Sequence, residues 1–354
     1  MHQTKISDTV TISRKKPAYK ISKALHRYLR QYSRETQIPC RYEDLRRYHF
    51  AIPLIDKNGQ DTLWETVFYS DNDREELYPA LTTIYAILKT AGDTSVMQHL
   101  FVDRVDYCTF GNSNPFRVKI VNKFNDNYDY FYIKTADASR VYGLELEHIL
   151  SPNRINYITF EQTLIEEHIA GIPGDRFMAD YLDKPPINET RLAKEFTKFN
   201  ERCLIKLLGD MRAYNFVIDI TPDFDDIQYR IRAIDFDQQC YESRKNLYLP
   251  QYFKENFPLV NLCIKRMTPE SIRQYQYEER ALMANRIQGS YHQVKALLDV
   301  MCQETLSTPE KIAQLRQELA QHYQNSAFEN CETMGEIVKM SLKNLLKSGG
   351  NLKF

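Results

Sequence analysis

Several short stretches of this 354-residue chain alternate apolar with polar side chains and are rich in β-branched and aromatic residues. A two-residue period predicts β-strands, because successive side chains of a strand point to opposite faces. Turn-forming residues separate most of these stretches. The expected strands are Phe50–Ile55, Thr62–Phe68, Phe101–Phe110, Phe116–Asn122, Tyr128–Thr135, Ile155–Phe160, Gln162–Ile169, Phe216–Ile220 and Tyr229–Ile234.

Other stretches space their apolar residues three or four positions apart, as one face of an α-helix does. Three helices are expected among the strands, at Arg74–Thr90, Ala138–Leu150 and Asn188–Leu208. From Pro258 onwards the chain is expected to be helical, with helices at Pro258–Arg266, Pro269–Ile287, Tyr291–Glu304, Pro309–Tyr323 and Thr333–Lys347. The last helix is basic and amphipathic, which suits either packing on its own domain or contact with a membrane surface.

Three polar residues stand out in the stretch from Leu207 to Glu242. Asp210 and Asn215 come just before the first strand of a predicted hairpin, and Asp235 comes just after its second strand. Because the strands of a hairpin are antiparallel, the loops at these two strand ends should meet. Two acids and an amide at one place are what a Mg²⁺–nucleotide site needs. The alternative is that Asp210 caps a turn and Asp235 ends a strand in solvent.

This spacing resembles the catalytic and metal-binding loops of the protein-kinase-like superfamily, where an Asp, four residues and an Asn are followed one hairpin later by D-F-G. Gly209-Asp210 and Asp235-Phe236-Asp237 are closer to the G-D and I-D-F-D sequences of aminoglycoside phosphotransferases and HipA-type kinases. The resemblance covers residues 100–300 and implies ATP with Mg²⁺ or Mn²⁺ as cofactors.

The resemblance also implies a role for each residue of the motif. Asp210 would orient the acceptor hydroxyl group and accept its proton. Asn215 and Asp235 would hold the metal ion, and Asp237 would add a ligand or bind the backbone of its loop.

A lysine of the nucleotide site is expected at the end of the strand Tyr128–Thr135. Tyr132-Ile133-Lys134 resembles the V-A-I-K sequence of kinases, whose lysine contacts the α- and β-phosphates and is held by a carboxylate. The following helix offers Glu145 and Glu147 as partners, and Glu145 is preferred because Ile149 lies one turn later. The alternative is that Lys134 ends an exposed strand.

Two further parts of a nucleotide site are implied by the resemblance. Ile165 to Gly174 is similar to the superfamily hinge, so the backbone C=O of Glu167 and the N–H of Ile169 would meet the adenine edge, with His168 facing solvent and taking no catalytic role. The loop after Phe110 has no G-x-G-x-x-G sequence and holds one glycine. Gly111, with its Asn and Ser neighbours, would cover the phosphates.

The expected fold class is therefore α+β: a bilobal protein-kinase-like fold with a small lobe built on an antiparallel sheet and a helical large lobe. The predicted divisions are a basic N-terminal extension at residues 1–99, a small lobe at 100–170, a large lobe at 171–305 and a helical C-terminal extension at 306–354.

Composition limits the partners and the cellular location that are expected for this protein. The formal net charge is zero and no RNA-binding motif is present, so no nucleic-acid partner is expected. The seven cysteines are scattered without C-x-x-C spacing, which indicates reduced thiols and a reducing compartment. No apolar run reaches the length of a transmembrane helix. These features predict a cytoplasmic protein, including one delivered into the cytoplasm of a host cell.

The segment from Arg14 to Arg47 is strongly basic. Apolar residues at helical spacing leave a row of cations on the other face, which suits an inositol phosphate or an anionic lipid headgroup. An equally favoured alternative is a solvated helix face that balances acids elsewhere. The candidate polyanion-binding residues are Lys20, Lys23, Arg27, Arg30 and Arg34.

The function expected from these features is ATP-dependent phosphoryl transfer. No A-P-E signature follows Gln239, and the large extensions resemble the divergent Ser/Thr kinases that intracellular bacterial pathogens inject into host cells. A protein acceptor is favoured over a small molecule. Three alternatives stay open: an antibiotic-type small-molecule kinase, for which the acids between Asp223 and Asp226 would bind the substrate, an enzyme that transfers AMP, and a non-catalytic pseudokinase scaffold.

Overall fold

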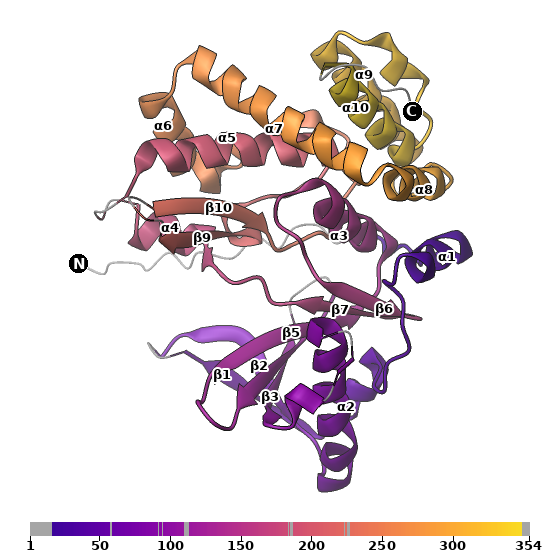
Figure 1. Cartoon of the computed structure of the whole chain (residues 1–354), viewed down its shortest axis with the longest axis vertical. Helices are drawn as coiled ribbons and strands as arrows, with labels where there is room; N and C mark the ends of the chain where they lie inside the picture. The colour runs from indigo at the N-terminus through magenta and orange to yellow at the C-terminus, as the bar shows by residue number, and fades with distance from the viewer. Residues whose placement is uncertain are drawn as a thin grey trace, which may run out of the picture.

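The chain folds into two lobes, which Figure 1 shows one above the other in a computed structural model. The structure describes residues 16–348 except 57–58, 91, 94, 110–112, 183, 185–186, 223 and 225–226. A seven-stranded antiparallel sheet forms the small lobe, and helices with a short sheet form the large lobe. The expected α+β fold class with two lobes of this kind is confirmed.

The small lobe is built on one sheet with the strand order β1-β2-β3-β4-β5-β7-β6. All neighbouring strands pair antiparallel. β1 is one edge strand of this sheet and β2 lies next to it, although both come from the region predicted as an N-terminal extension. The strands are β1 (Phe50–Ile55), β2 (Asp61–Phe68), β3 (Leu100–Cys108), β4 (Phe116–Asn122), β5 (Tyr128–Thr135), β6 (Tyr157–Phe160) and β7 (Thr163–Glu167).

The two faces of this sheet differ. Helix α2 (Asp71–Thr90) covers one face, where apolar residues such as Phe131 and Ile133 of β5 join its core. Because strand side chains alternate, Tyr132 and Lys134 of β5 point to the opposite face.

The large lobe contains a small sheet with the strand order β10-β9-β8, packed under helices. Its core is a single apolar cluster that also includes residues of the N-terminal helix α1. The strands are β8 (Ile172–Pro173), β9 (Phe216–Pro222) and β10 (Ile227–Ala233). The helices are α4 (Gly174–Asp180), α5 (Glu189–Lys206), α6 (Phe257–Arg266), α7 (Pro269–Gly289), α8 (Tyr291–Met301), α9 (Pro309–Tyr323) and α10 (Met334–Ser348).

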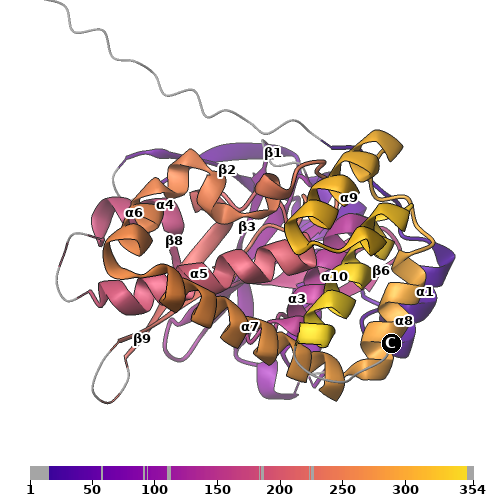
Figure 2. The same ribbon diagram turned by 90° about the horizontal axis from the view of Figure 1, so that it is seen from above.

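Helix α3 (Ala138–Leu150) lies between the lobes and is buried on nearly every side. Asp137 caps its first turn by accepting a hydrogen bond from the Arg140 N–H group at 3.2 Å. Figure 2 shows α1 (Lys23–Gln31) next to α8 at the edge of the molecule. The N-terminal helix therefore packs on α8, and its Tyr28 reaches the Glu145 carboxylate of α3.

The C-terminal helix α10 packs within the large lobe. Its apolar residues, among them Ile337, Val338 and Leu342, are fully buried. Of the two interpretations of this helix, packing on its own domain therefore accounts for its apolar face. In the described part of the chain, no helix has both the length and the apolar character that crossing a membrane requires.

Candidate active site

The two loops of the central hairpin lie side by side, as the sequence predicts. The N–H group of Ile234 donates to the Asn215 carbonyl oxygen at 3.0 Å, and the N–H group of Cys240 donates to the Leu207 carbonyl oxygen at 2.9 Å. These bonds join the loop before β9 to the loop after β10. The three polar residues of the motif therefore stand at the same end of the hairpin.

Asp210 is held in an unusual environment for a carboxylate. Its backbone is in the left-handed region, with φ 57°, which Asp and Asn tolerate better than most residues. Arg212 donates to one carboxylate oxygen at 2.8 Å and also pairs with Glu255 at 2.7 Å. Burial raises the pKa of Asp210 to about 6, and the nearby Asp235 raises it as well, against the pull of Arg212. A carboxylate with this pKa is suited to accept a proton near neutral pH.

Asn215 and Asp235 each keep an oxygen atom for a metal ion. The Asn215 side-chain N–H group donates to the Asp210 carbonyl oxygen at 2.7 Å, which fixes the amide and leaves its Oδ1 without a partner in the described chain. Asp235 Oδ1 accepts the backbone N–H of Asp237 at 3.0 Å, and its Oδ2 has no partner there. These residues fit Mg²⁺, which prefers oxygen ligands and usually shares them with nucleotide phosphates.

No group of three or more His, Cys, Asp or Glu side chains in the described residues is arranged to hold a metal ion. A metal ion at this site would therefore depend on oxygen atoms of the nucleotide. Burial, followed by the neighbouring Asp237, raises the pKa of Asp235, so a nearby cation stabilises its ionised form.

Lys134 is buried and bonds to Glu166 of the adjacent strand β7 at 2.8 Å. Burial lowers the pKa of Lys134, Arg140 lowers it further, and Glu166 opposes both. The prediction that Glu145 is the partner of this lysine is wrong. The alternative that Lys134 ends an exposed strand is wrong, because the side chain is buried, and its role at a nucleotide site stays a prediction.

Arg140, in the first turn of α3, connects Lys134 to the central motif. Its Nε and Nη2 atoms donate to the two carboxylate oxygens of Glu166. Its Nη1 donates to Asp235 at 2.9 Å and to Asp237 at 2.7 Å. The sequence interpretation missed both Arg140 and Glu166, because neither lies at a motif position. Through them, Lys134, Asp235 and Asp237 belong to one continuous charge network.

Glu145 lies on another side of α3 and ties four elements together. Tyr28 of α1, Tyr157 of β6 and Gln293 of α8 donate to its carboxylate at 2.8, 2.5 and 2.8 Å. Arg34 pairs with it at 3.1 Å. Glu145 is fully buried in this network and has no contact with Lys134. Its role in the fold is to fasten α3 to the N-terminal segment and the large lobe.

The predicted hinge follows β7 and crosses to the large lobe. The N–H group of Ile169 donates no hydrogen bond within the described chain, and its contact with a base edge stays a prediction. Glu167 receives the backbone N–H of Asn156 on its side chain at 2.7 Å. His168 is not a purely solvent-facing side chain, because its Nδ1 is 3.1 Å from the Tyr132 hydroxyl group. Tyr132 and Lys134 are two positions apart on β5, so the Tyr132 ring lies on the same sheet face as Lys134.

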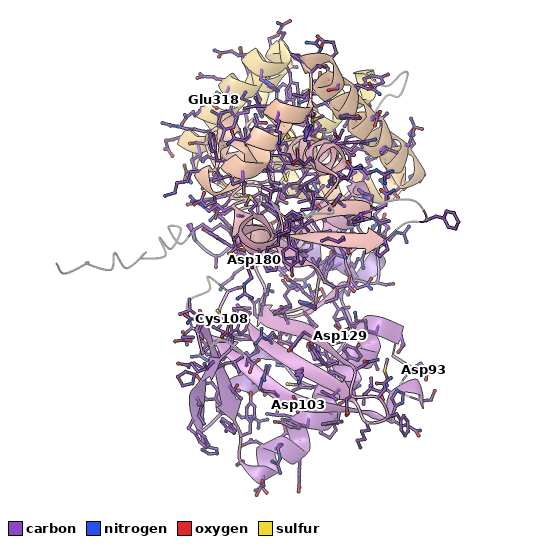
Figure 3. The ribbon with its side chains drawn as sticks, turned by 90° about the vertical axis from the view of Figure 1, so that its left-hand side faces the viewer. Asp93, Asp103, Cys108, Asp129, Asp180 and Glu318 are labelled. Atoms are coloured by element: carbon purple, nitrogen blue, oxygen red, sulfur yellow. The ribbon has the colours of Figure 1, made fainter. Side chains whose placement is uncertain are left out.

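Ser113 and Asn114, the described residues at the end of the turn between β3 and β4, lie close to the motif. In Figure 3, Cys108 at the end of β3 lies at the waist between the lobes, whereas Asp103 on the same strand lies further out on the sheet. Asn114 of the turn and Asp237 line one cavity of about 200 Å³. That the turn covers a phosphate stays a prediction. Gly111, and all the acids between Asp223 and Asp226, lie outside the described residues.

The candidate polyanion residues fall into two groups. Lys20, Lys23, Arg27 and Arg30 are exposed, and Arg30 alone of these has an ion-pair partner in the described chain, Glu35 at 3.8 Å. Arg34 differs from them, because it turns inward to Glu145 and its guanidinium group lies 4.9 Å from the centre of the Tyr157 ring. Lys23, Arg27 and Arg30 are spaced three or four residues apart on α1, so they lie along one stripe of that helix, and Lys20 lies just before it in the chain.

Comparisons with known proteins find similarity at the level of structure. No protein-family model matches the chain, and no curated protein matches it. The autoinhibited serine kinase domain of the giant muscle protein titin aligns with 70% of this chain and 93% of its own length, at 10% sequence identity and a TM-score of 0.28. A similarity at this TM-score supports no conclusion about function, so the activity of this chain has to be inferred from the geometry of its own site.

Proposed function

We propose that this chain is an ATP-dependent phosphotransferase. The observation that carries the proposal is the single network in which Glu166 and Arg140 join Lys134 to Asp235 and Asp237, beside the loop of Asp210. Buried cations and carboxylates that shift one another's pKa values in this way are typical of catalytic sites. A nucleotide site explains why they are assembled between two lobes.

Each residue has a separate task in the proposed reaction. Lys134, held by Glu166, binds phosphate oxygens of the donor nucleotide. Asn215 and Asp235 hold the metal ion, which when bound neutralises charge on the transferred phosphoryl group. Asp210 orients the acceptor hydroxyl group and takes its proton. The backbone at Glu167 and Ile169 binds the adenine edge. Catalysis then comes mainly from positioning and electrostatics.

The test of this proposal is label transfer from ATP with Mg²⁺. Label from the γ-position on a protein acceptor supports kinase activity, and label from the α-position instead indicates AMP transfer on the same site. Asp235→Asn should abolish either signal, because the variant keeps the bond to Arg140 and loses the charge that holds the metal. We expect a loss of at least about 10³-fold, equivalent to several kcal/mol of barrier.

Asp180→Asn, a change of the same kind at an exposed position on α4, serves as the matched control and should keep full activity. Nucleotide binding without transfer of either label would support a pseudokinase scaffold. Failure to bind any nucleotide would contradict the proposal altogether.

For the acceptor, we favour a Ser or Thr hydroxyl group of a protein, in keeping with the resemblance to bacterial effector kinases. Incubation with a protein mixture, aminoglycosides and choline in parallel separates protein from small-molecule acceptors. Transfer to a small molecule alone would overturn this choice and favour the antibiotic-type kinase.

We also propose that a polyanion such as an inositol phosphate binds the exposed stripe of cations on and before α1. A ligand there would act on α3, because α1 reaches Glu145 through Tyr28. Inositol hexakisphosphate at 100 times its Kd should stabilise the protein by about 2.7 kcal/mol and raise its melting temperature. The double variant K23E/R27E should lose this rise. Arg273→Glu, on the exposed side of α7, is the control and should keep it. An unchanged melting temperature of the unmodified protein would refute the proposal.

A further inference from the structure

Arg140 places a permanent positive charge among carboxylates that a metal ion would otherwise occupy. Its side chain is 2% exposed. One nitrogen atom, Nη1, lies 2.9 Å from Asp235 and 2.7 Å from Asp237, so it bridges the two carboxylates. A bridging cation would make the same contacts. Unlike a metal ion, a guanidinium group neither dissociates nor loses its proton in proteins.

The guanidinium group is fixed in this position from both ends. Its other two nitrogen atoms, Nε and Nη2, form a bidentate pair with the two carboxylate oxygens of Glu166. The helix behind it is anchored as well, because the Ser139 hydroxyl donates to the Gln239 carbonyl oxygen at 2.6 Å. Gly143 packs so closely on the loop that an added Cβ atom would lie 3.0 Å from Phe236. The helix and the guanidinium group are therefore both anchored where Arg140 meets the carboxylates.

The charge of the protein groups around Asp237 bears on whether a second metal ion can bind there. Lys134 and Arg140 face Glu166, Asp235 and Asp237, so the formal sum of these side chains is −1 with Arg140 and would be −2 without it. One divalent ion at Asn215 and Oδ2 of Asp235 would be shared with the phosphates of the nucleotide. A second ion at Asp237 would have to lie against the guanidinium group, where like charges repel.

From this geometry we infer that Arg140 takes the place of a second divalent cation, so that the site loads one metal ion per nucleotide. The inference rests on the proposed phosphotransferase function and deepens it. Sites of this general kind in protein kinases hold two Mg²⁺ ions. Here Asp237 would serve the arginine instead of a metal, and Arg140 would be a positioning residue for Asp235.

The experiment counts Mn²⁺ ions by electron paramagnetic resonance in the complex with a non-hydrolysable ATP analogue. The unmodified protein should bind one Mn²⁺ per bound nucleotide, at Mn²⁺ concentrations well above saturation. Arg140→Gln removes the fixed charge and should bind two. Arg176→Gln, at an exposed position on α4, is the control and should bind one.

Each outcome has a distinct meaning. Two Mn²⁺ ions in the unmodified protein overturn the inference without touching the proposed function, and this result needs no variant to fold. One ion in both the unmodified protein and Arg140→Gln also overturns it, because the arginine then does not limit the count. If the unmodified protein binds no nucleotide, the proposed function itself fails and the inference falls with it.

Discussion

Asp210→Asn should reduce phosphoryl transfer by about 10²–10⁴-fold, the usual contribution of a proton-accepting side chain, without lowering the stability of the protein. The variant keeps an oxygen atom for the bond from Arg212, which Asp210 receives at 2.8 Å. Asn also tolerates the left-handed backbone of this position, φ 57°. The loss would therefore report the missing proton acceptor and not a distorted loop.

The stability of this variant follows from the raised pKa. Folding raises the pKa of Asp210 from 3.8 to about 6, so the folded protein binds this proton more tightly than the unfolded chain. Stability therefore falls as the pH rises between these two values. At pH 8 the ionised carboxylate costs about 1–3 kcal/mol, which an Asn residue does not. Asp210→Asn should melt at an equal or higher temperature at pH 8, with the advantage vanishing by pH 4.

The pH profile provides the third measurement for the same residue. For the unmodified protein, kcat/KM should fall about tenfold per pH unit below pH 6, because the protonated carboxyl group cannot accept the proton of the acceptor hydroxyl. Asp180→Asn should reproduce this profile. A profile that stays flat down to pH 5, or a variant that is both active and less stable, would remove Asp210 from the role of base.

The strands and helices of this fold could largely be predicted from the sequence, because local patterns determine them. The strands β1, β4 and β5 and the helix α3 begin and end at the predicted residues. Asn188 caps α5 as expected, by accepting a hydrogen bond from the Arg191 N–H group at 3.0 Å. The meeting of the two motif loops was also predictable, since a hairpin fixes which strand ends are neighbours.

The charge network was not predictable in the same way. Arg140 meets Asp237, which is 97 positions later in the chain, and no local spacing encodes that contact. The prediction that Glu145 pairs with Lys134 fails for a simple geometric reason. Five residues of α-helix turn the chain by about 500°, so Glu145 projects about 140° away from Arg140. The side of α3 that carries Arg140 also carries Glu147, which pairs with Lys206 of the large lobe.

A second large effect is expected at Glu166, the carboxylate that pairs with Lys134. Glu166→Gln should abolish nucleotide binding and should destabilise the protein by roughly 3–5 kcal/mol, because Lys134 and Arg140 would both lose their buried counter-charge. Since Glu166 contributes more than Asp237 to opposing the lowering of the Lys134 pKa, the lysine of the variant should also lose its proton at a lower pH. Calorimetric titration with ATP and thermal unfolding measure the two effects.

Glu145→Gln is the matched control, because it makes the same chemical change at a buried glutamate of the adjoining helix. It weakens the bonds from Tyr28 and Tyr157 and the pair with Arg34, so a stability loss of about 1–3 kcal/mol is expected. Nucleotide binding should persist at temperatures where the variant is folded, because no atom of Glu145 contacts Lys134. The reverse result, with binding lost in Glu145→Gln and kept in Glu166→Gln, would mean that α3 rotates when nucleotide binds and that the charges around Lys134 exchange partners.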